Sequence, residues 1–301
     1  MKLYAPKYYK EFVCIADKCR HSCCIGWEID VDRETAEKYK KMTDGYGLEI
    51  KKSLFHKGTT HFKLKKDDRC PHLNECGLCK IILNLGEDFL CEICREHPRF
   101  YNDTCRGKEV GLGISCEEAC RIILSSDSYS EFYEIGEIDE PFDSDEWDFD
   151  ALSERDKIYA ILSNSSLSHT EKLSAIEEKY NISPKNISDE KWQKRLSSLE
   201  YLEEEHRLLF NSYSSCAEVS EELEKPLERA LAYFVFRHCS TAYDREEFCA
   251  ALGLSLFLER LLTSLSSNAP ENIAEYARII SEELEYSEDN TDALKFEFSI
   301  I

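Results

Sequence analysis

The sequence predicts a mainly α-helical protein in which a cysteine-rich N-terminal part precedes a helical C-terminal part. Twelve of the fifteen cysteines lie between Cys14 and Cys120. Residues 136–150 contain eight acidic residues, one proline and no basic residue, which is typical of a linker. Beyond this stretch, apolar residues recur at helical spacing. We therefore expect a loop-rich, metal-binding domain with short helices and a small strand pair over residues 1–135, an acidic linker over 136–150, and an α-helical domain over 151–301.

Local signals predict three elements in the N-terminal part. Asp32 is suited to cap a helix that begins at residue 33 and ends with basic residues. Residues 61–65 alternate in polarity, which indicates a short strand. Ser115 precedes "CEEACRIILSS", which we expect to be a short helix that closes the cysteine-rich region.

In the C-terminal part, apolar periodicity predicts a series of helices. Pro226 interrupts the fourth of them, where we expect a kink or a new helix start. The expected helices cover residues 153–162, 168–180, 188–211, 217–242, 245–266 and 270–286.

Charge divides at the same place as the cysteines. Residues 1–120 contain 21 Lys and Arg against 20 Asp and Glu, a net charge of +1. Because the whole chain has a net charge of −22, residues 121–301 carry −23. Duplex nucleic acid is a poor partner for such an acidic surface, because binding requires cationic groups at the phosphates. A lysine-rich protein is a better match, although an acidic surface also serves solubility alone.

The spacing of the cysteines indicates a metal site. Two CxxC pairs, Cys76/Cys79 and Cys91/Cys94, each place two thiolates on one side of a tight loop. An odd number of cysteines argues against a disulfide framework. The sequence shows no signal-peptide pattern and no long, purely apolar run, so we expect a cytoplasmic protein with reduced thiols and no membrane partner. The predicted ligands are Cys14, Cys19, Cys23, Cys24, Cys70, Cys76, Cys79, Cys91 and Cys94.

Residue types alone leave the identity of the metal open. Thiolates suit zinc and iron–sulfur clusters equally. Because Cys23 and Cys24 are adjacent, their side chains point in different directions, so we expect one of the two to share a site with Cys14, Cys19 and ligands from residues 70–94. His21, His72 and His97 are further candidate metal ligands. Histidines near such a site more commonly lie on the surface or pack in the core.

Several classes of enzyme are not indicated. The CxxxCxxC motif of radical S-adenosylmethionine enzymes is absent. Gly26 and Ile123 stand where a third cysteine would follow each CxxxC pair. The sequence also lacks a dinucleotide-binding GxGxxG, a P-loop and a GxSxG motif. Any chemistry must therefore come from the metal region and its neighbours.

Three stretches together resemble the flagellin lysine-N-methylases (FliB type), whose cysteine-rich region also occurs in proteins described as zinc- or iron-chelating. They are "FVCIADKCRHSCCIGWEIDVDRETAEKY", "CPHLNECGLCKIILNLGEDFLCEICREHPR" and "GISCEEACRIIL". The match extends over about residues 8–125, and the helical remainder is similar only in character and length. His97 replaces the tyrosine that usually precedes the Pro-Arg pair, which puts any role of that ring in doubt.

This resemblance implies methyl transfer from S-adenosylmethionine to lysine side chains of flagellin, or of another lysine-rich protein, with a [4Fe-4S] cluster held by the cysteine-rich region and zinc as the alternative. Aromatic faces hold sulfonium groups, and arginine pairs with carboxylates, so we expect Trp27, Arg99 and Tyr101 to contact the methyl donor. No residue is assigned as the catalytic base. The alternative functions are a non-catalytic zinc- or iron-binding protein, or a redox sensor, whose acidic helical domain binds a partner.

Overall fold

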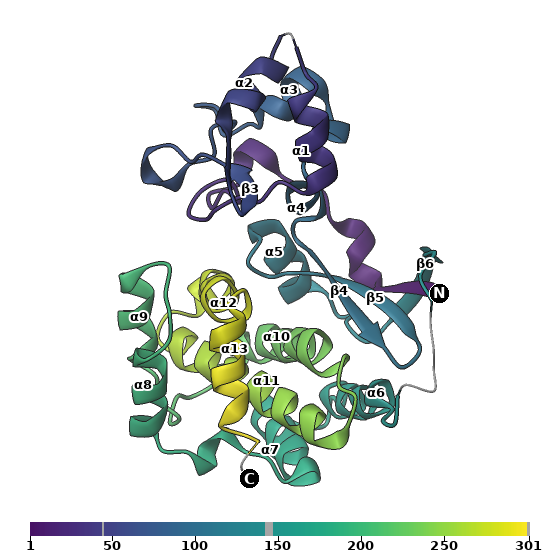
Figure 1. Ribbon diagram of the computed structural model, residues 1–301. Coiled ribbons are helices and arrows are strands. Elements are labelled where there is room, and N and C mark those ends of the chain that lie inside the picture. Colours follow the sequence, from purple (N-terminus) through teal and green to yellow (C-terminus); the bar gives the residue numbers. More distant parts are fainter. Residues whose placement is uncertain (44, 142–146, 300–301) are drawn as a thin grey trace. The chain divides into compact units, whose positions relative to one another are not determined.

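The computed structural model describes residues 1–43, 45–141 and 147–299. The described chain is mainly α-helical, as predicted. It folds into two compact units, shown in Figure 1. The cysteine-rich unit consists of Val13–Arg99 with Cys116–Glu118, and the helical unit consists of Met1–Phe12, Phe100–Ser115 and Ala119–Ile301.

Short elements build the cysteine-rich unit. The β2–β3 hairpin pairs Phe55 with His61 and provides the predicted strand pair. The elements are η2 (Ala16–Lys18), α1 (Arg33–Lys40), α2 (Gly47–Ser53), β2 (Leu54–Lys57), β3 (Thr59–Phe62), η3 (Lys66–Asp68), α3 (Lys80–Leu85), η4 (Glu87–Phe89) and α4 (Glu92–Glu96).

Asp32 caps α1 as predicted. Its side chain accepts a hydrogen bond from the Thr35 backbone N–H at 2.8 Å and a second from the Glu92 backbone N–H at 2.9 Å. One carboxylate therefore joins the starts of α1 and α4. Partial burial opposes its ionisation, but the two N–H groups outweigh burial and lower the pKa of Asp32.

We expect Asp32→Ala to lower the free energy of unfolding by about 1–2 kcal/mol, because both helix starts lose an acceptor. Asp32→Asn is the matched control, since asparagine also caps helices. The contribution of a carboxyl with a lowered pKa is present at neutral pH and is lost as pH falls through that pKa. The difference between wild type and Asp32→Ala, measured by urea unfolding, should therefore shrink in acid. An equal difference at neutral and acidic pH would contradict this assignment.

A four-stranded sheet belongs to the helical unit, although all its strands come from the first 137 residues. Strand β1 (Lys2–Pro6) pairs in parallel with β5 (Gly107–Leu112) and antiparallel with β6 (Phe132–Glu137). With β4 (Arg99–Thr104), the strand order is β4-β5-β1-β6. The unit boundaries therefore differ from the predicted ranges, because these distant segments meet through backbone hydrogen bonds that local sequence patterns do not encode.

Helices form the remainder of the helical unit (Figure 1). Lys7–Glu11 forms a short 3-10 turn, η1, after β1, and α5 (Glu117–Ser125) spans the division between the units. Two further 3-10 turns are η6 (Pro184–Asn186) and η7 (Pro270–Asn272). The other helices are α6 (Ala151–Leu162), α7 (His169–Tyr180), α8 (Asp189–Ser197), α9 (Glu204–Phe210), α10 (Glu221–Cys239), α11 (Arg245–Ser266), α12 (Ile273–Ile280), the π-helical η8 (Ser281–Glu285) and α13 (Glu288–Phe296).

Helices α10 and α11, with 12 and 17 buried residues, each carry more of the buried residues of this unit than any other of its helices. Trp192 of α8 stacks on Phe257 of α11 with ring centroids 3.8 Å apart and is fully buried. By length and composition, α11 could cross a membrane, which the expectation from short apolar runs missed. In its most apolar window, 83% is buried against the unit, as in the core helix of a globular protein.

The structure differs from the expected helices at three places. The helix predicted over residues 188–211 is interrupted between α8 and α9, where the Leu202 and Glu203 backbone N–H groups donate to the Glu283 carboxylate. Of the kink or new helix start expected at Pro226, the new start is wrong, because α10 runs through this residue from Glu221 to Cys239. The C-terminal helix α13 was not predicted. Residues 142–146 of the predicted acidic linker lie outside the described residues.

Candidate metal centre

Five of the nine predicted ligands lie in one hydrophobic core of the cysteine-rich unit. Around them pack buried apolar side chains, among them Ile29, Tyr39 and Ile81. The Cys70 backbone N–H donates to the Cys24 carbonyl at 2.8 Å, which joins the N-terminal loop to the second cysteine segment. Burial of cysteines with apolar residues alone is ordinary, but five in one small core are not. They are Cys24, Cys70, Cys79, Cys91 and Cys94.

Two short helices position three of these sulfurs. Cys79 directly precedes α3, where the backbone N–H groups of Ile81 and Ile82 point at its sulfur. Cys91 directly precedes α4 and Cys94 lies within it, so the helical turn brings their sulfurs into hydrogen-bond contact. N–H groups directed at a sulfur stabilise its thiolate form, which is the form that binds metal.

The surroundings keep most of these thiols protonated when no metal is bound. Burial raises the pKa of Cys70 to about 12 and also raises that of Cys79. The pKa of Cys24 is raised by its hydrogen bond with Cys23 and by burial, and that of Cys94 is raised by its hydrogen bond with Cys91 and by burial. A metal bound here must therefore displace protons, so its affinity should fall as pH falls.

The other four predicted ligands lie outside this core. Cys14, Cys23 and Cys76 are exposed. The Cys19 thiol contacts the His21 carbonyl at 3.0 Å and a Glu117 carboxylate oxygen at 3.6 Å, and burial raises its pKa to about 11. Of the adjacent pair, Cys24 is thus the member that packs with the second segment, and Cys14 and Cys19 lie outside this core.

The sulfur atoms of the core can be compared with the geometry of a zinc site. Four thiolates around one zinc ion lie about 3.8 Å apart, given Zn–S bonds of about 2.3 Å. Among the described residues, which include all fifteen cysteines, no three cysteine sulfurs lie within 4.8 Å of one another. The five core thiols, as a donor set, therefore suit a zinc ion and an iron–sulfur cluster alike.

Histidines contribute less than the sequence allowed. The two ring nitrogens of His72 contact the hydroxyls of Tyr46 at 2.6 Å and Ser53 at 2.8 Å, so both are already used. Burial lowers the pKa of His72 to about 4, and burial lowers that of His97 to about 4 as well. His72 is thus a neutral structural residue within the core.

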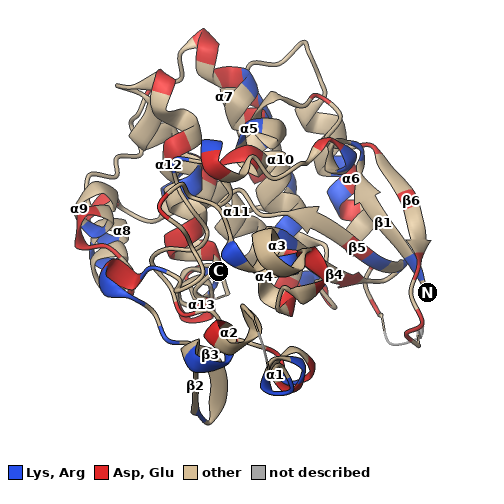
Figure 2. Ribbon diagram, turned by 90° about the horizontal axis from the view of Figure 1, so that it is seen from above, with Lys and Arg blue, Asp and Glu red and all other residues tan. Residues whose placement is uncertain are grey.

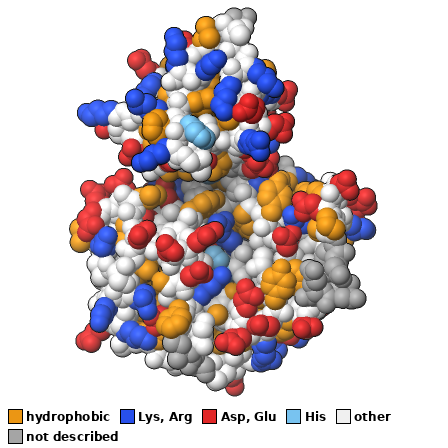
Figure 3. Space-filling view, in the orientation of Figure 1, with side chains coloured by type: hydrophobic (Ala, Val, Ile, Leu, Met, Phe, Trp, Pro, Cys, Tyr) orange, Lys and Arg blue, Asp and Glu red, His pale blue; other side chains and the backbone are white. Residues whose placement is uncertain are grey.

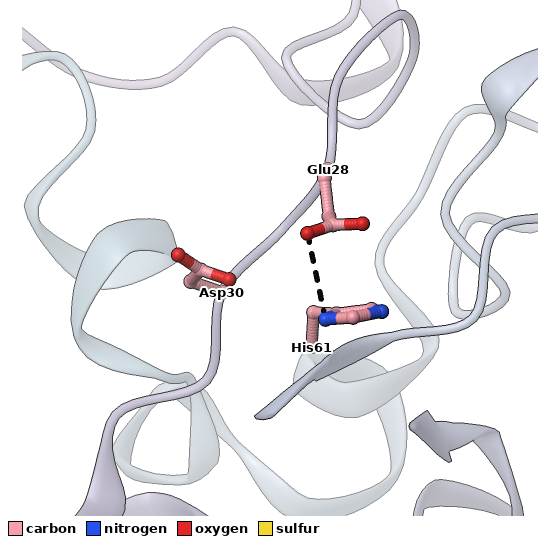
Figure 4. Close-up of side chains that lie close together, drawn as sticks. All are labelled: Glu28, Asp30 and His61. Carbon is pink, nitrogen blue, oxygen red and sulfur yellow. Dashed lines mark ion pairs between the residues drawn. The ribbon is translucent and has the colours of Figure 1, made fainter. Parts of the chain in front are cut away.

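A different group of possible ligands was missed by sequence analysis. Asp30 and His61 lie opposite each other across an antiparallel bridge, and the Glu28 carboxylate lies 3.4 Å from His61 Nδ1. Figure 4 shows the three side chains together, with donor atoms within 4.8 Å of one another. The sequence pattern that could have indicated this group is the alternation Glu28-Ile29-Asp30, in which Ile29 is buried and the two acids lie on the opposite face. The two acids are exposed, so the arrangement is also that of an ordinary polar surface.

The three residues expected to contact a methyl donor belong to different units. Trp27 donates from Nε1 to the Cys23 carbonyl at 2.9 Å and packs against the cysteine core. Arg99 donates to the Arg95 carbonyl at 3.4 Å, in the same unit. Tyr101 lies on β4 of the helical unit and is 48% exposed.

The fold and the site define a two-unit protein with a thiol-rich core that could hold a metal centre. The chain is 29% identical over 129 residues to the lysine-N-methylase of Salmonella typhimurium and, over the same length, to that of Salmonella choleraesuis. It is 28% identical over 127 residues to the flagellar biosynthetic protein FliU of Salmonella muenchen. These comparisons confirm the resemblance to the flagellin lysine-N-methylase family.

The similarity is partial. Each alignment covers 40% of this chain, and it covers 32% of the two lysine-N-methylases and 75% of FliU. The matched part thus corresponds to about a third of the length of the lysine-N-methylases. No family model matches the chain, and no solved structure matches it.

Proposed function

We propose that the protein is an S-adenosylmethionine-dependent protein-lysine N-methyltransferase that acts on flagellin and carries a [4Fe-4S] cluster in its cysteine-rich unit. The observation that carries this proposal is the similarity to two proteins named lysine-N-methylase. The name of the third relative, a flagellar biosynthetic protein, supports a flagellar substrate. A cytoplasmic location, where the thiols stay reduced, is part of the proposal.

The proposed cluster ligands come from the five core cysteines Cys24, Cys70, Cys79, Cys91 and Cys94. When bound, the cluster would supply a one-electron centre and join three segments of the chain. Thiolates suit a single zinc ion as well, and zinc remains the alternative metal.

A lysine side chain must lose its proton before it can attack a methyl group, so the enzyme must desolvate the ammonium or place a base beside it. The charge of the protein favours a cationic substrate: residues 121–301 carry 40 Asp and Glu against 17 Lys and Arg. Figure 2 shows acidic residues along many helices of the helical unit. Such a field raises the local concentration of a lysine-rich partner and loses strength as salt is added.

The test is a methylation assay with protein purified without oxygen, flagellin and labelled S-adenosylmethionine. We expect label on flagellin lysines, identified by mass spectrometry of peptides, at a rate that falls with added salt. Flagellin whose lysines have been blocked by acetylation is the control and should stay unlabelled. If metal-loaded protein neither labels flagellin nor binds the methyl donor, the methyltransferase proposal is wrong and a non-catalytic metal-binding or redox-sensing role is favoured.

A further inference from the structure

The helical unit has an open groove of about 340 Å³, to which the proposed function has so far assigned no role. It lies where β4, the end of α10, η8 and α13 meet. Figure 3 shows acidic and basic side chains side by side over α13. The groove is lined by Phe100, Tyr101, Asn102, Arg237, His238, Glu285, Glu288, Thr291, Asp292 and Lys295.

Buried charged groups form one wall of the groove. The carboxylate of Glu285, wholly buried, accepts hydrogen bonds from the Tyr233 hydroxyl at 3.0 Å and from His238 Nε2 at 2.8 Å. Arg237 Nε lies 3.4 Å from the same carboxylate. Burying charges costs stability even when they are paired, and clusters of this kind beside a cavity are frequent at functional sites.

The backbone is also unusual at this point. Glu285 ends η8, a π-helical turn in which the Tyr286 backbone N–H donates to the Ser281 carbonyl at 3.2 Å. Such turns are rare and occur frequently at functional sites. Here the turn directs Glu285 inward, and Tyr286 follows it on the surface with 49% of its area exposed.

Aromatic rings face the cationic side chain of this wall. The Arg237 guanidinium lies 4.7 Å from the centroid of Phe100 and 4.8 Å from that of Tyr286. Because Glu285 neutralises Arg237, this wall adds no net charge to the groove. It offers ring faces and a guanidinium held in place.

One face of α13 supplies further charges. Glu288, Asp292 and Lys295 follow at positions i, i+4 and i+7, which share one side of a helix. Two negative charges and one positive charge therefore line the rim, in addition to the neutralised pair. A groove of this composition suits a small molecule that carries both a carboxylate and cationic groups, together with a flat ring.

From these contacts we infer that this groove binds S-adenosylmethionine, with Lys295 opposite the ligand's carboxylate, Glu288 and Asp292 opposite its cationic groups, and Tyr101 beside its ring. The inference rests on the proposed function, and it places the methyl donor in the helical unit. Of the three residues expected to contact the methyl donor, Tyr101 is then the one that lies in the same unit as the groove. The volume falls within the range of small-molecule sites. The lysine side chain of a protein substrate, in contrast, has no carboxylate with which Lys295 could pair.

The test is isothermal titration of wild-type, metal-loaded protein and its variants with S-adenosylmethionine and with S-adenosylhomocysteine. Loss of a charge-assisted hydrogen bond should weaken binding of both ligands roughly tenfold in Lys295→Gln. Asp292→Asn should weaken binding of the sulfonium-bearing donor more than that of the neutral thioether. Lys185→Gln, at an exposed lysine elsewhere in the unit, is the control and should bind as wild type does.

The outcomes separate this inference from the proposed function. If wild type binds the methyl donor and both groove variants bind it equally well, the donor lies elsewhere and the inference is wrong, while methyl transfer stands. If the groove variants instead weaken only the binding of a lysine-rich flagellin peptide, the groove is a substrate site. If wild type binds neither nucleoside, the methyltransferase proposal fails with the inference. Both substitutions keep good helix formers or polar residues on a surface, so the fold should persist, which circular dichroism checks.

Discussion

Cys94→Ala should lose the metal and a large part of the stability of the cysteine-rich unit together. Cys94 lies in the five-cysteine core beside Cys91, and metal bound by thiolates contributes directly to folding. If the free concentration of the metal or cluster is about a thousandfold above its dissociation constant, losing it lowers the free energy of unfolding by about 4 kcal/mol. Iron, sulfide and zinc content of anaerobically purified protein, with its visible absorption spectrum and urea unfolding, measures both effects.

Cys216→Ala is the matched control, because Cys216 is an exposed cysteine outside the predicted ligands. It should keep wild-type metal content and stability. After removal of the metal with a chelator, wild type and Cys94→Ala should unfold at similar urea concentrations, since the difference between them resides in the metal. Unchanged metal content in Cys94→Ala would refute Cys94 as a ligand, and a colourless wild type with stoichiometric zinc would refute the cluster.

Arg155→Met should destabilise the helical unit by about 3–5 kcal/mol, because it leaves a buried carboxylate without its partner. Arg155 of α6 donates two hydrogen bonds to Glu109 of β5, at 2.6 and 2.8 Å, and both side chains are about 95% buried. Its guanidinium also lies 4.3 Å from the ring centroid of Phe132 on β6. This one side chain therefore fastens a helix of the unit to two strands of its sheet. Chemical denaturation followed by circular dichroism measures the effect.

The double variant Arg155→Met/Glu109→Leu should recover much of the loss, since it removes the unpaired charge as well. Lys157→Met is the comparison on the same helix: half of the Lys157 side chain is exposed, so solvent screens its ion pair with Glu154 and little change is expected. A double variant as unstable as Arg155→Met would show that packing, and not the uncompensated charge, causes the loss.

Local chemistry explains why several elements could be predicted. Asp32 caps α1 and Ser168 caps α7, each through a hydrogen bond within the next three residues, so their signals lie in short stretches of sequence. The helix expected over residues 245–266 matches α11, because its capping residue Asp244 and its apolar periodicity agree. The interruption between α8 and α9 could not be predicted in this way, since the backbone there is bonded to Glu283 of a distant segment.

The sequence by itself determined that the protein is mainly helical, that its cysteines are concentrated near the N-terminus with the spacing of metal ligands, and that it resembles the lysine-N-methylases. Those properties depend on residue type and on neighbours in the chain. Only the tertiary structure decided which thiols share a core, that β1 and β5 join the helical unit, and that Glu285, Arg237 and α13 form a groove. These features arise from contacts between residues far apart in the sequence, whose cost in chain entropy is offset by burial and pairing that no local pattern records.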